Sequence, residues 1–221
     1  MSGTLQATIL KDGASSTNNL TFDSSGNATV GNNLTVTGNT SVTGTITGSS
    51  TIAAATGTLY PIVSGTAQAS TSGTSITFSS IPSWVKRVTV MFNAVSTNGT
   101  SLVQVQIGSG GVTSTGYTSG SNFYGPISSG SSYTSTTGFL VDSGGGNAAW
   151  VRYGQLILTL QNPSSNTWVS SSNIYTNSSG SSYIFGSGGV VALSGALDRV
   201  VITTANGTDT FDAGSINIFY E

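Results

Sequence analysis

The sequence lacks histidine and cysteine altogether. Histidine is the most common general base and metal ligand, and cysteine supplies thiolate nucleophiles and many structural zinc ligands. Their absence removes the usual routes to acid–base catalysis, thiol chemistry and zinc binding. Without cysteine, no disulfide bond stabilises the fold. We therefore expect a protein that is not an enzyme and that has no cofactor.

Charged residues are also scarce, at 5% of the chain against about 25% in an ordinary globular protein. The formal net charge is −2 and no basic patch is present, so nucleic acid is not an expected partner. No apolar run approaches the ~20 residues that span a bilayer, and the N-terminus lacks the basic and apolar regions of a secretory signal. We expect synthesis in the cytoplasm, no signal peptide and no membrane insertion.

Residues 31–48 consist almost entirely of Gly, Thr, Asn and Ser with single apolar residues between them. Leu34, Val36, Val42 and Ile46 stand between Thr, Ser or Asn neighbours, which is strand periodicity with one narrow apolar face. One such strip buries too little surface to offset an ordering entropy of roughly 1–2 kcal/mol per residue. We predict that three chains intertwine here and that these four residues form the trimer core of a shaft. A disordered Gly/Ser-rich linker is the alternative.

Composition changes at Tyr60-Pro61, after which apolar runs lengthen and aromatic residues appear. The sequence therefore predicts an N-terminal region of residues 1–60, which contains the shaft, and a C-terminal head domain of residues 61–221; the resemblance described below implies that the N-terminal region also attaches to the virion. Roughly nine alternating runs in the head recur about every 8–12 residues, which favours an antiparallel β-sandwich or jelly roll over βαβ units. We thus expect an all-β protein, with head strands that include residues 150–160, 167–175, 183–185 and 190–193.

Three local expectations are specific. Residues 86–95 and 102–107 alternate on either side of Asn98-Gly99, so they are predicted to pair as a hairpin. Residues 51–55 have the only helical character before residue 60 and are expected to form a one-turn collar. The glycine cluster at 186–189 does not precede a helix and lacks the Lys-Ser/Thr of a phosphate loop, so it is interpreted as a flexible turn.

Asp209 and Asp212 are the nearest pair of carboxylates and lie between two predicted strands. The first interpretation is a solvated turn in which an Asp side chain accepts local hydrogen bonds. A weak calcium site completed by backbone carbonyl groups and a catalytic carboxylate pair, as in glycosidases, are the alternatives.

Six aromatic residues of the head stand among Gly, Ser and Asn: Tyr117, Phe123, Tyr124, Tyr133, Tyr175 and Tyr183. An aromatic face stacks on the C–H face of a sugar while neighbouring amides and hydroxyls bind its hydroxyl groups. These six residues are therefore the candidate carbohydrate-binding residues. The alternative is that the rings fill the core or a subunit interface.

Two stretches, Leu5-Gln-Ala-Thr-Ile-Leu-Lys-Asp-Gly13 and the Gly/Thr-rich run of residues 20–38, resemble the repeat-rich shafts of tail fibres from tailed bacteriophages. The end, Ala213-Gly-Ser-Ile-Asn-Ile-Phe-Tyr-Glu221, is similar to the ends of their distal β-sandwich domains. The resemblance implies a homotrimer in the virion tail that binds other tail or virion proteins through its N-terminus and a host-surface glycan or protein through its head. The family shares no catalytic residues. A purely structural virion component, such as a head fibre, decoration or tail adaptor protein, is the alternative.

Overall fold

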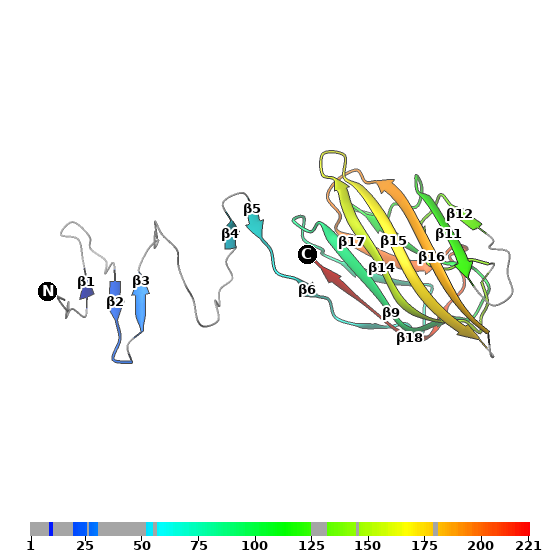
Figure 1. The fold of residues 1–221 in the computed structure, drawn as a ribbon, viewed down its shortest axis with the longest axis horizontal. Helices are drawn as coiled ribbons and strands as arrows, with labels where there is room; N and C mark the ends of the chain where they lie inside the picture. Colours follow the sequence, from blue (N-terminus) through cyan, green and yellow to red (C-terminus); the bar gives the residue numbers. More distant parts are fainter. Residues whose placement is uncertain are drawn as a thin grey trace. The chain divides into compact units, whose positions relative to one another are not determined.

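A computed structural model describes residues 9–10, 20–25, 27–30, 52–54, 57–124, 132–144, 146–178 and 181–221. Every regular element within these ranges is a β-strand and every strand pair is antiparallel, which confirms the all-β fold class (Figure 1). No helix in this part of the chain is long and apolar enough to cross a membrane. The chain divides into two units, Met1–Ser50 and Thr51–Glu221, and the boundary at residues 60 and 61 stays a prediction.

The N-terminal unit contains a three-stranded sheet in the order β1 (Ile9–Leu10), β2 (Leu20–Phe22) and β3 (Ala28–Val30). The Asp23 carboxylate stabilises the turn between β2 and β3, because its Oδ1 accepts hydrogen bonds from the backbone amides of Ser25 (2.8 Å) and Asn27 (2.9 Å). The predicted shaft core lies outside the described residues and stays a prediction: Leu34, Val36, Val42 and Ile46.

The expected helical collar at residues 51–55 is wrong, because Ile52–Ala54 form strand β4. This strand pairs with β5 (Gly57–Leu59) over three residue pairs. A single helical turn fixes several backbone dihedrals for one hydrogen bond, whereas β4 has a partner residue on β5 at each of its three positions. Local propensity was therefore overridden by strand pairing.

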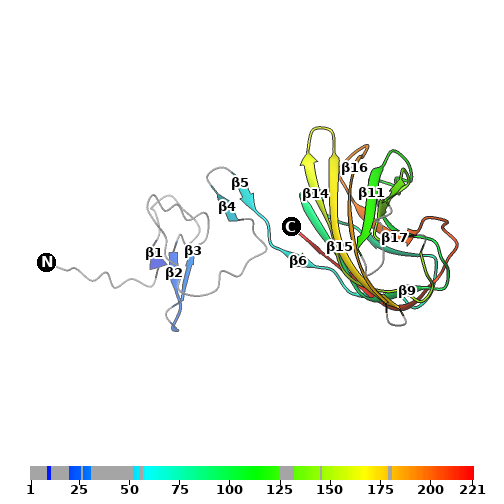
Figure 2. The ribbon, with the colours of Figure 1, turned by 45° about the vertical axis from the view of Figure 1, so that its right-hand side comes forward.

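The larger sheet of the C-terminal unit has nine strands, including β7 (Gln68–Ala69), which pairs with β18. The other eight follow the order β12 (Ser132–Ser135), β11 (Thr118–Tyr124), β16 (Ser181–Ala192), β15 (Thr167–Ser178), β14 (Val151–Asn162), β9 (Arg87–Thr97), β18 (Phe211–Tyr220) and β6 (Val63–Ser64). The long strands β14, β15 and β16 lie side by side, and Figure 2 shows that they curve along their length.

The smaller sheet has four strands in the order β13 (Phe139–Leu140), β10 (Val103–Gly108), β17 (Arg199–Thr204) and β8 (Ser75–Ser79). Alternate residues of both sheets are buried in one apolar core, as expected when each strand directs every second side chain inward. Complete burial of one such side chain contributes about 1.5–3 kcal/mol. The core includes, from the larger sheet, Val88, Val90, Leu156 and Leu158, and from the smaller one, Val105, Ile107, Val200 and Ile202. The C-terminal unit is therefore sandwich-like.

The predicted hairpin between residues 86–95 and 102–107 is wrong. Strand β9 pairs with β14 and β18 in the larger sheet, whereas β10 pairs with β13 and β17 in the smaller one. Asn98 does not close a tight turn: its backbone amide donates to the carbonyl of Thr210, and its side-chain oxygen accepts from the Thr210 amide, both at 2.9 Å. The segment thus carries the chain from one sheet to the other.

Candidate functional site: the outer face of the larger sheet

Tyr117, one of the six candidate binding residues, lies in the core and is only 2% exposed. Its ring packs edge-on against Phe139, with 4.9 Å between ring centroids. The hydroxyl group accepts a hydrogen bond from the Ile107 amide (2.8 Å) and donates one to the Thr113 carbonyl (3.0 Å). Burial raises the pKa of Tyr117 to about 12, with a smaller opposing effect of the Ile107 amide. The structure thus gives Tyr117 a packing role.

Phe123 and Tyr183 are half-buried and pack against the core together with Trp150 and Phe185. Phe123 and Tyr183 meet edge to face at 6.0 Å, and the Trp150 and Phe185 ring centroids are 5.1 Å apart. Tyr183 also contacts Trp150 at 5.9 Å. These contacts link β11, β16 and the residue before β14, so most of the surface of both candidate rings is used in packing.

Tyr175 is exposed on the outer face of the larger sheet, at 41%. It lies directly across from Tyr153 on β14, with ring centroids 6.3 Å apart, and from Ile184 on β16. Tyr153 and Ile184 are also exposed, so the three side chains form an apolar row across three strands. The sequence analysis missed Tyr153, although the inward Leu156 and Leu158 place odd-numbered residues of this strand on the opposite face.

The last two candidates lie at the β11–β12 edge of the sheet. Tyr124 is the final residue of β11, and its side chain is outside the described part of the structure. Tyr133 on β12 is half-buried and is one of nine residues that line a surface hollow of about 470 Å³. The nine are Gly120, Ser121, Asn122, Ser132, Tyr133, Thr134, Gly186, Ser187 and Gly188.

Three glycines form the floor of the hollow: Gly120 on β11 and Gly186 and Gly188 on β16. Gly120 lies across from Gly188, and Asn122 on β11 lies across from Gly186. A Cβ atom added to Gly186 would meet no atom within 4 Å, so this position faces open space. The interpretation of residues 186–189 as a flexible turn, and of 183–185 and 190–193 as separate strands, is wrong, since one continuous strand, β16, contains them up to Ala192. Partners on both sides, β11 and β15, keep this glycine-rich segment extended.

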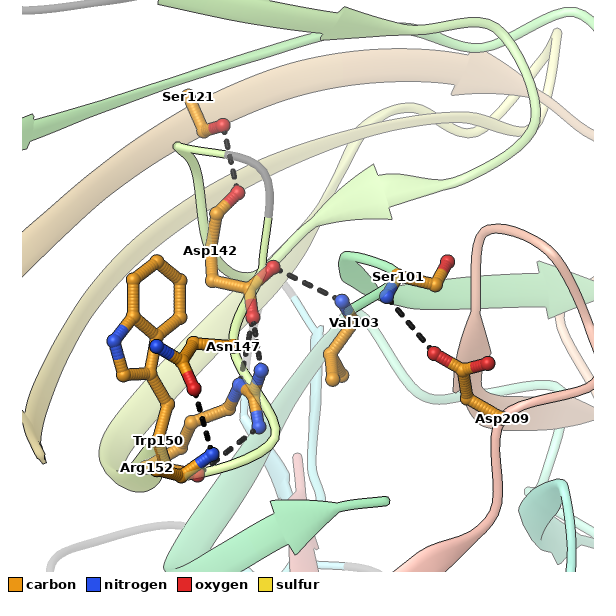
Figure 3. Close-up of polar contacts among 9 residues, drawn as sticks. Ser101, Val103, Ser121, Asp142, Asn147, Trp150, Arg152 and Asp209 are labelled. Carbon is orange, nitrogen blue, oxygen red and sulfur yellow. Dashed lines mark hydrogen bonds and ion pairs between the residues drawn. The ribbon is translucent and has the colours of Figure 1, made fainter. Parts of the chain in front are cut away.

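The outer face of β14, β15 and β16 carries no charged side chain. The only charged residue of these strands, Arg152, is fully buried, and Figure 3 shows its contacts with Asp142. Its Nε and Nη2 lie 2.7 and 2.6 Å from Oδ2 of Asp142, which is equally buried. Asp142 Oδ1 also accepts from the Val103 amide of β10 (2.9 Å), and the Asp142 carbonyl accepts from the Ser121 hydroxyl of β11 (2.8 Å).

This buried pair connects both sheets, and no sequence pattern indicated it. Burial raises the pKa of Asp142, while the Arg152 guanidinium and the Val103 amide act in the opposite direction. The contacts of the carboxylate go to groups of the chain itself, and neither residue lines the hollow. We therefore assign the pair to structural support of the face and not to ligand binding.

Asp209 and Asp212 have separate partners. Asp209 accepts hydrogen bonds from the Ser101 amide (2.8 Å; Figure 3) and the Asn206 side chain (2.7 Å), and both interactions lower the pKa of Asp209. Asp212 accepts from the Ser96 hydroxyl. Within the described ranges, no three His, Cys, Asp or Glu side chains gather as metal ligands would. The hydrogen bonds of Asp209 are those expected of a turn carboxylate, and the calcium and catalytic alternatives stay predictions.

Comparison of the chain with protein-family models, with curated proteins and with solved structures gave no match. What the chain does therefore has to be inferred from its own residues. One feature that packing does not explain is the outer face of β14, β15 and β16, where an exposed apolar row adjoins an uncharged hollow.

Proposed function

We propose that the chain is a homotrimeric fibre protein of a tailed bacteriophage, as its sequence resemblance implies. In this proposal residues 1–60 attach to other virion proteins and form an intertwined shaft. Residues 61–221 form a sandwich or jelly-roll head that recognises a glycan or protein on the host surface. The protein acts by binding and has no catalytic role.

The observation that supports recognition is the exposed row of Tyr153, Tyr175 and Ile184 on a face without charge. Exposed apolar side chains that lie together among polar ones commonly mark a binding surface. Tyrosine suits this role because its ring offers a broad apolar face and its hydroxyl group a polar end. Here the Tyr175 hydroxyl is within 3.1 Å of the Ser182 hydroxyl, which holds the ring in place beside its neighbours.

The support beneath this face is rigid. Strands β14, β15 and β16 pair over most of their length, and their inward apolar residues are part of the core. A face fixed by strand pairing and core packing can bind without first being ordered, which avoids an entropic cost of association. This rigidity is what a protein that must recognise a surface at first contact requires.

Association of three chains is supported by the N-terminal unit. Its strands β1, β2 and β3 are only two or three residues long. Sheets of this size are marginal in water unless they pack against further structure. Copies of the same chain would supply that structure, in agreement with the narrow apolar face that the sequence shows after residue 31.

Light scattering of the full chain tests the trimer: the expected mass is three times the 22.2 kDa of one chain. A monomer at micromolar concentration would refute the shaft. Adsorption of labelled protein to a panel of bacterial strains tests recognition. Tyr175→Ala should weaken adsorption about tenfold, whereas Phe219→Ala, an equally exposed aromatic substitution on β18, should leave it unchanged. Equal adsorption of both variants would refute the assignment of the face.

The alternative, a purely structural virion component, is favoured by one observation: Tyr117, Phe123 and Tyr183 are engaged in packing and leave fewer rings for a receptor. A stable trimer that adsorbs to no strain, and whose Tyr175→Ala variant still incorporates into virions, would support this alternative over the first proposal.

A further inference from the structure

Three glycines lie in the interior of neighbouring strands on the outer face: Gly120 on β11, and Gly186 and Gly188 on β16. Glycine weakens a strand because it loses the most conformational freedom on folding and offers no side chain to pack. A group of such residues on one face therefore calls for a reason, and the usual reasons are backbone conformation and close packing.

Neither reason applies here. None of the three has a positive φ, unlike Gly154 or Gly214 elsewhere in the described sheet. A Cβ atom would meet nothing within 4 Å at Gly186, and at Gly188 and Gly120 only a carbonyl oxygen at 3.5 and 3.6 Å, which is ordinary contact.

The neighbouring Gly189 shows the contrast, because a Cβ atom there would lie 2.7 Å from the Thr118 carbonyl and 2.9 Å from the Phe139 ring. Packing requires glycine at position 189 but not at the three floor positions. What the three residues preserve is an empty hollow, and glycine in a strand interior often marks a site that a ligand approaches closely.

The chemistry of the hollow limits what could occupy it. Asn122 lines the hollow, and Asn173, which is not one of the nine lining residues, lies in register on the other side of Gly186; both asparagines are exposed. Ser132 and Thr134 add hydroxyl groups from β12, and no lining residue is charged. The volume of about 470 Å³ lies within the range of small-molecule sites. Neutral amides and hydroxyls around a flat floor match a neutral compound that is rich in hydroxyl groups.

A peptide strand or a second copy fits less well. The backbone of the floor is already paired, since β16 has β11 on one side and β15 on the other, so a peptide strand could not pair with the floor itself. Apart from Tyr133, the lining residues have no large apolar side chain, which a protein interface core would use. A sugar ring needs neither an unpaired strand backbone nor a large apolar side chain.

We propose that the hollow over Gly120, Gly186 and Gly188 binds one unit of a neutral saccharide between the amides of Asn122 and Asn173. Tyr175, the next outward residue after Asn173 on β15, supplies an aromatic ring one row further along. This inference rests on the proposed recognition function and adds the position of the site and the class of its ligand.

The test uses the full chain and ligand-observed NMR with methyl glycosides of glucose, galactose and mannose, with N-acetylglucosamine, and with N-acetylneuraminic acid as a charged comparison. We expect saturable binding of at least one neutral sugar, with a dissociation constant on the order of 1 mM, and no preference for the acidic one. Gly186→Val should fill the hollow and weaken binding about tenfold or more. Its melting temperature should stay the same or rise, because valine suits an exposed strand position.

Thr159→Val is the matched control, since it places the same side chain on an exposed position of β14 outside the hollow; it should bind as the wild type does. Four results would overturn the inference. The first two are that no neutral sugar binds to the wild type, or that Gly186→Val binds as well as the wild type. The other two are a lower melting temperature of Gly186→Val, or a change in the oligomeric mass of this variant, which would indicate that a second copy occupies the hollow. If wild-type protein still adsorbs to cells while no neutral sugar binds, the hollow is excluded and the recognition function stands. If the wild-type protein also fails to adsorb to cells, both the saccharide site and the recognition function are refuted.

Discussion

The buried pair of Asp142 and Arg152 gives a direct measure of how the proposed binding face is supported. Arg152→Met removes the guanidinium but keeps an unbranched side chain, so charge changes more than shape. The Asp142 carboxylate then loses its ion pair and keeps the hydrogen bond from Val103. Leaving one partner of a fully buried pair without the other costs about 3–5 kcal/mol, a large part of the roughly 5–15 kcal/mol that stabilise a domain.

A double substitution, Asp142→Asn with Arg152→Met, should recover much of that loss. The asparagine oxygen can still accept from the Val103 amide, and no buried charge remains. The unpaired amide hydrogens should cost about 1–3 kcal/mol, so the double variant should be more stable than either single variant. The two sites are in contact, and their effects should therefore be far from additive.

Urea unfolding of the full chain at a fixed protein concentration, followed by tryptophan fluorescence, measures these differences. Arg199→Met is the matched control: the Arg199 ion pair with Asp198 is partly exposed, so its loss should have little effect. A double variant whose loss equals the sum of the single losses would refute the reasoning, because it would show that the two charges do not depend on each other.

The pH dependence of the Arg152→Met variant adds a second criterion. Burial raises the pKa of Asp142, and without the guanidinium the increase should be larger. A carboxyl group with a raised folded pKa contributes stability below its unfolded pKa of about 3.9, and this contribution is lost as pH rises through the folded pKa. The deficit of the variant should therefore be small near pH 4 and large near pH 7. A deficit that is constant over this range would contradict the assignment.

Three further outcomes are expected. Burial raises the pKa of Tyr117 to about 12, against about 10 in the unfolded chain, so the Tyr117 contribution to the free energy of unfolding should be complete below pH 10. It should fall by up to about 2.7 kcal/mol between pH 10 and 12. The urea midpoint of the Tyr117→Phe variant should fall less than that of the wild type over the same range. Gly214 has a φ of +92° and its Cβ would overlap the Ala94 carbonyl, so Gly214→Ala should lower stability by about 1–3 kcal/mol, whereas Gly186→Ala should not lower it. Binding to cells should change little with added salt, because the proposed face has no charge to screen.

Strand positions could largely be predicted from the sequence, because apolar alternation is a local signal. The run of residues 150–160 corresponds to β14 (Val151–Asn162), and residues 167–175 to the first part of β15 (Thr167–Ser178). Strand partners could not be predicted in the same way. The turn signal at Asn98-Gly99 suggested a hairpin, but β9 pairs with β14 and β18, which buries Val88 and Val90 in the core. The free energy gained by this burial depends on residues far away in the sequence, so a local pattern could not predict it.

The difference between local signals and strand pairing also explains why only part of the candidate site could be predicted from the sequence. Aromatic residues among Gly, Ser and Asn indicated binding, but the sequence could not separate Tyr117, which packs in the core, from Tyr175, which is exposed. The floor of the hollow was hidden for the opposite reason: Gly186 and Gly188 look like a turn when the chain is considered alone, and only pairing with β11 and β15 makes them part of a strand. Gly186 is held in an extended conformation by the strands on both sides, and a Cβ atom added there would contact no other atom, so this glycine leaves space above the sheet for a ligand. The most informative residues of this face are therefore those without a side chain, and filling that space at Gly186 tests function without a cost to the fold.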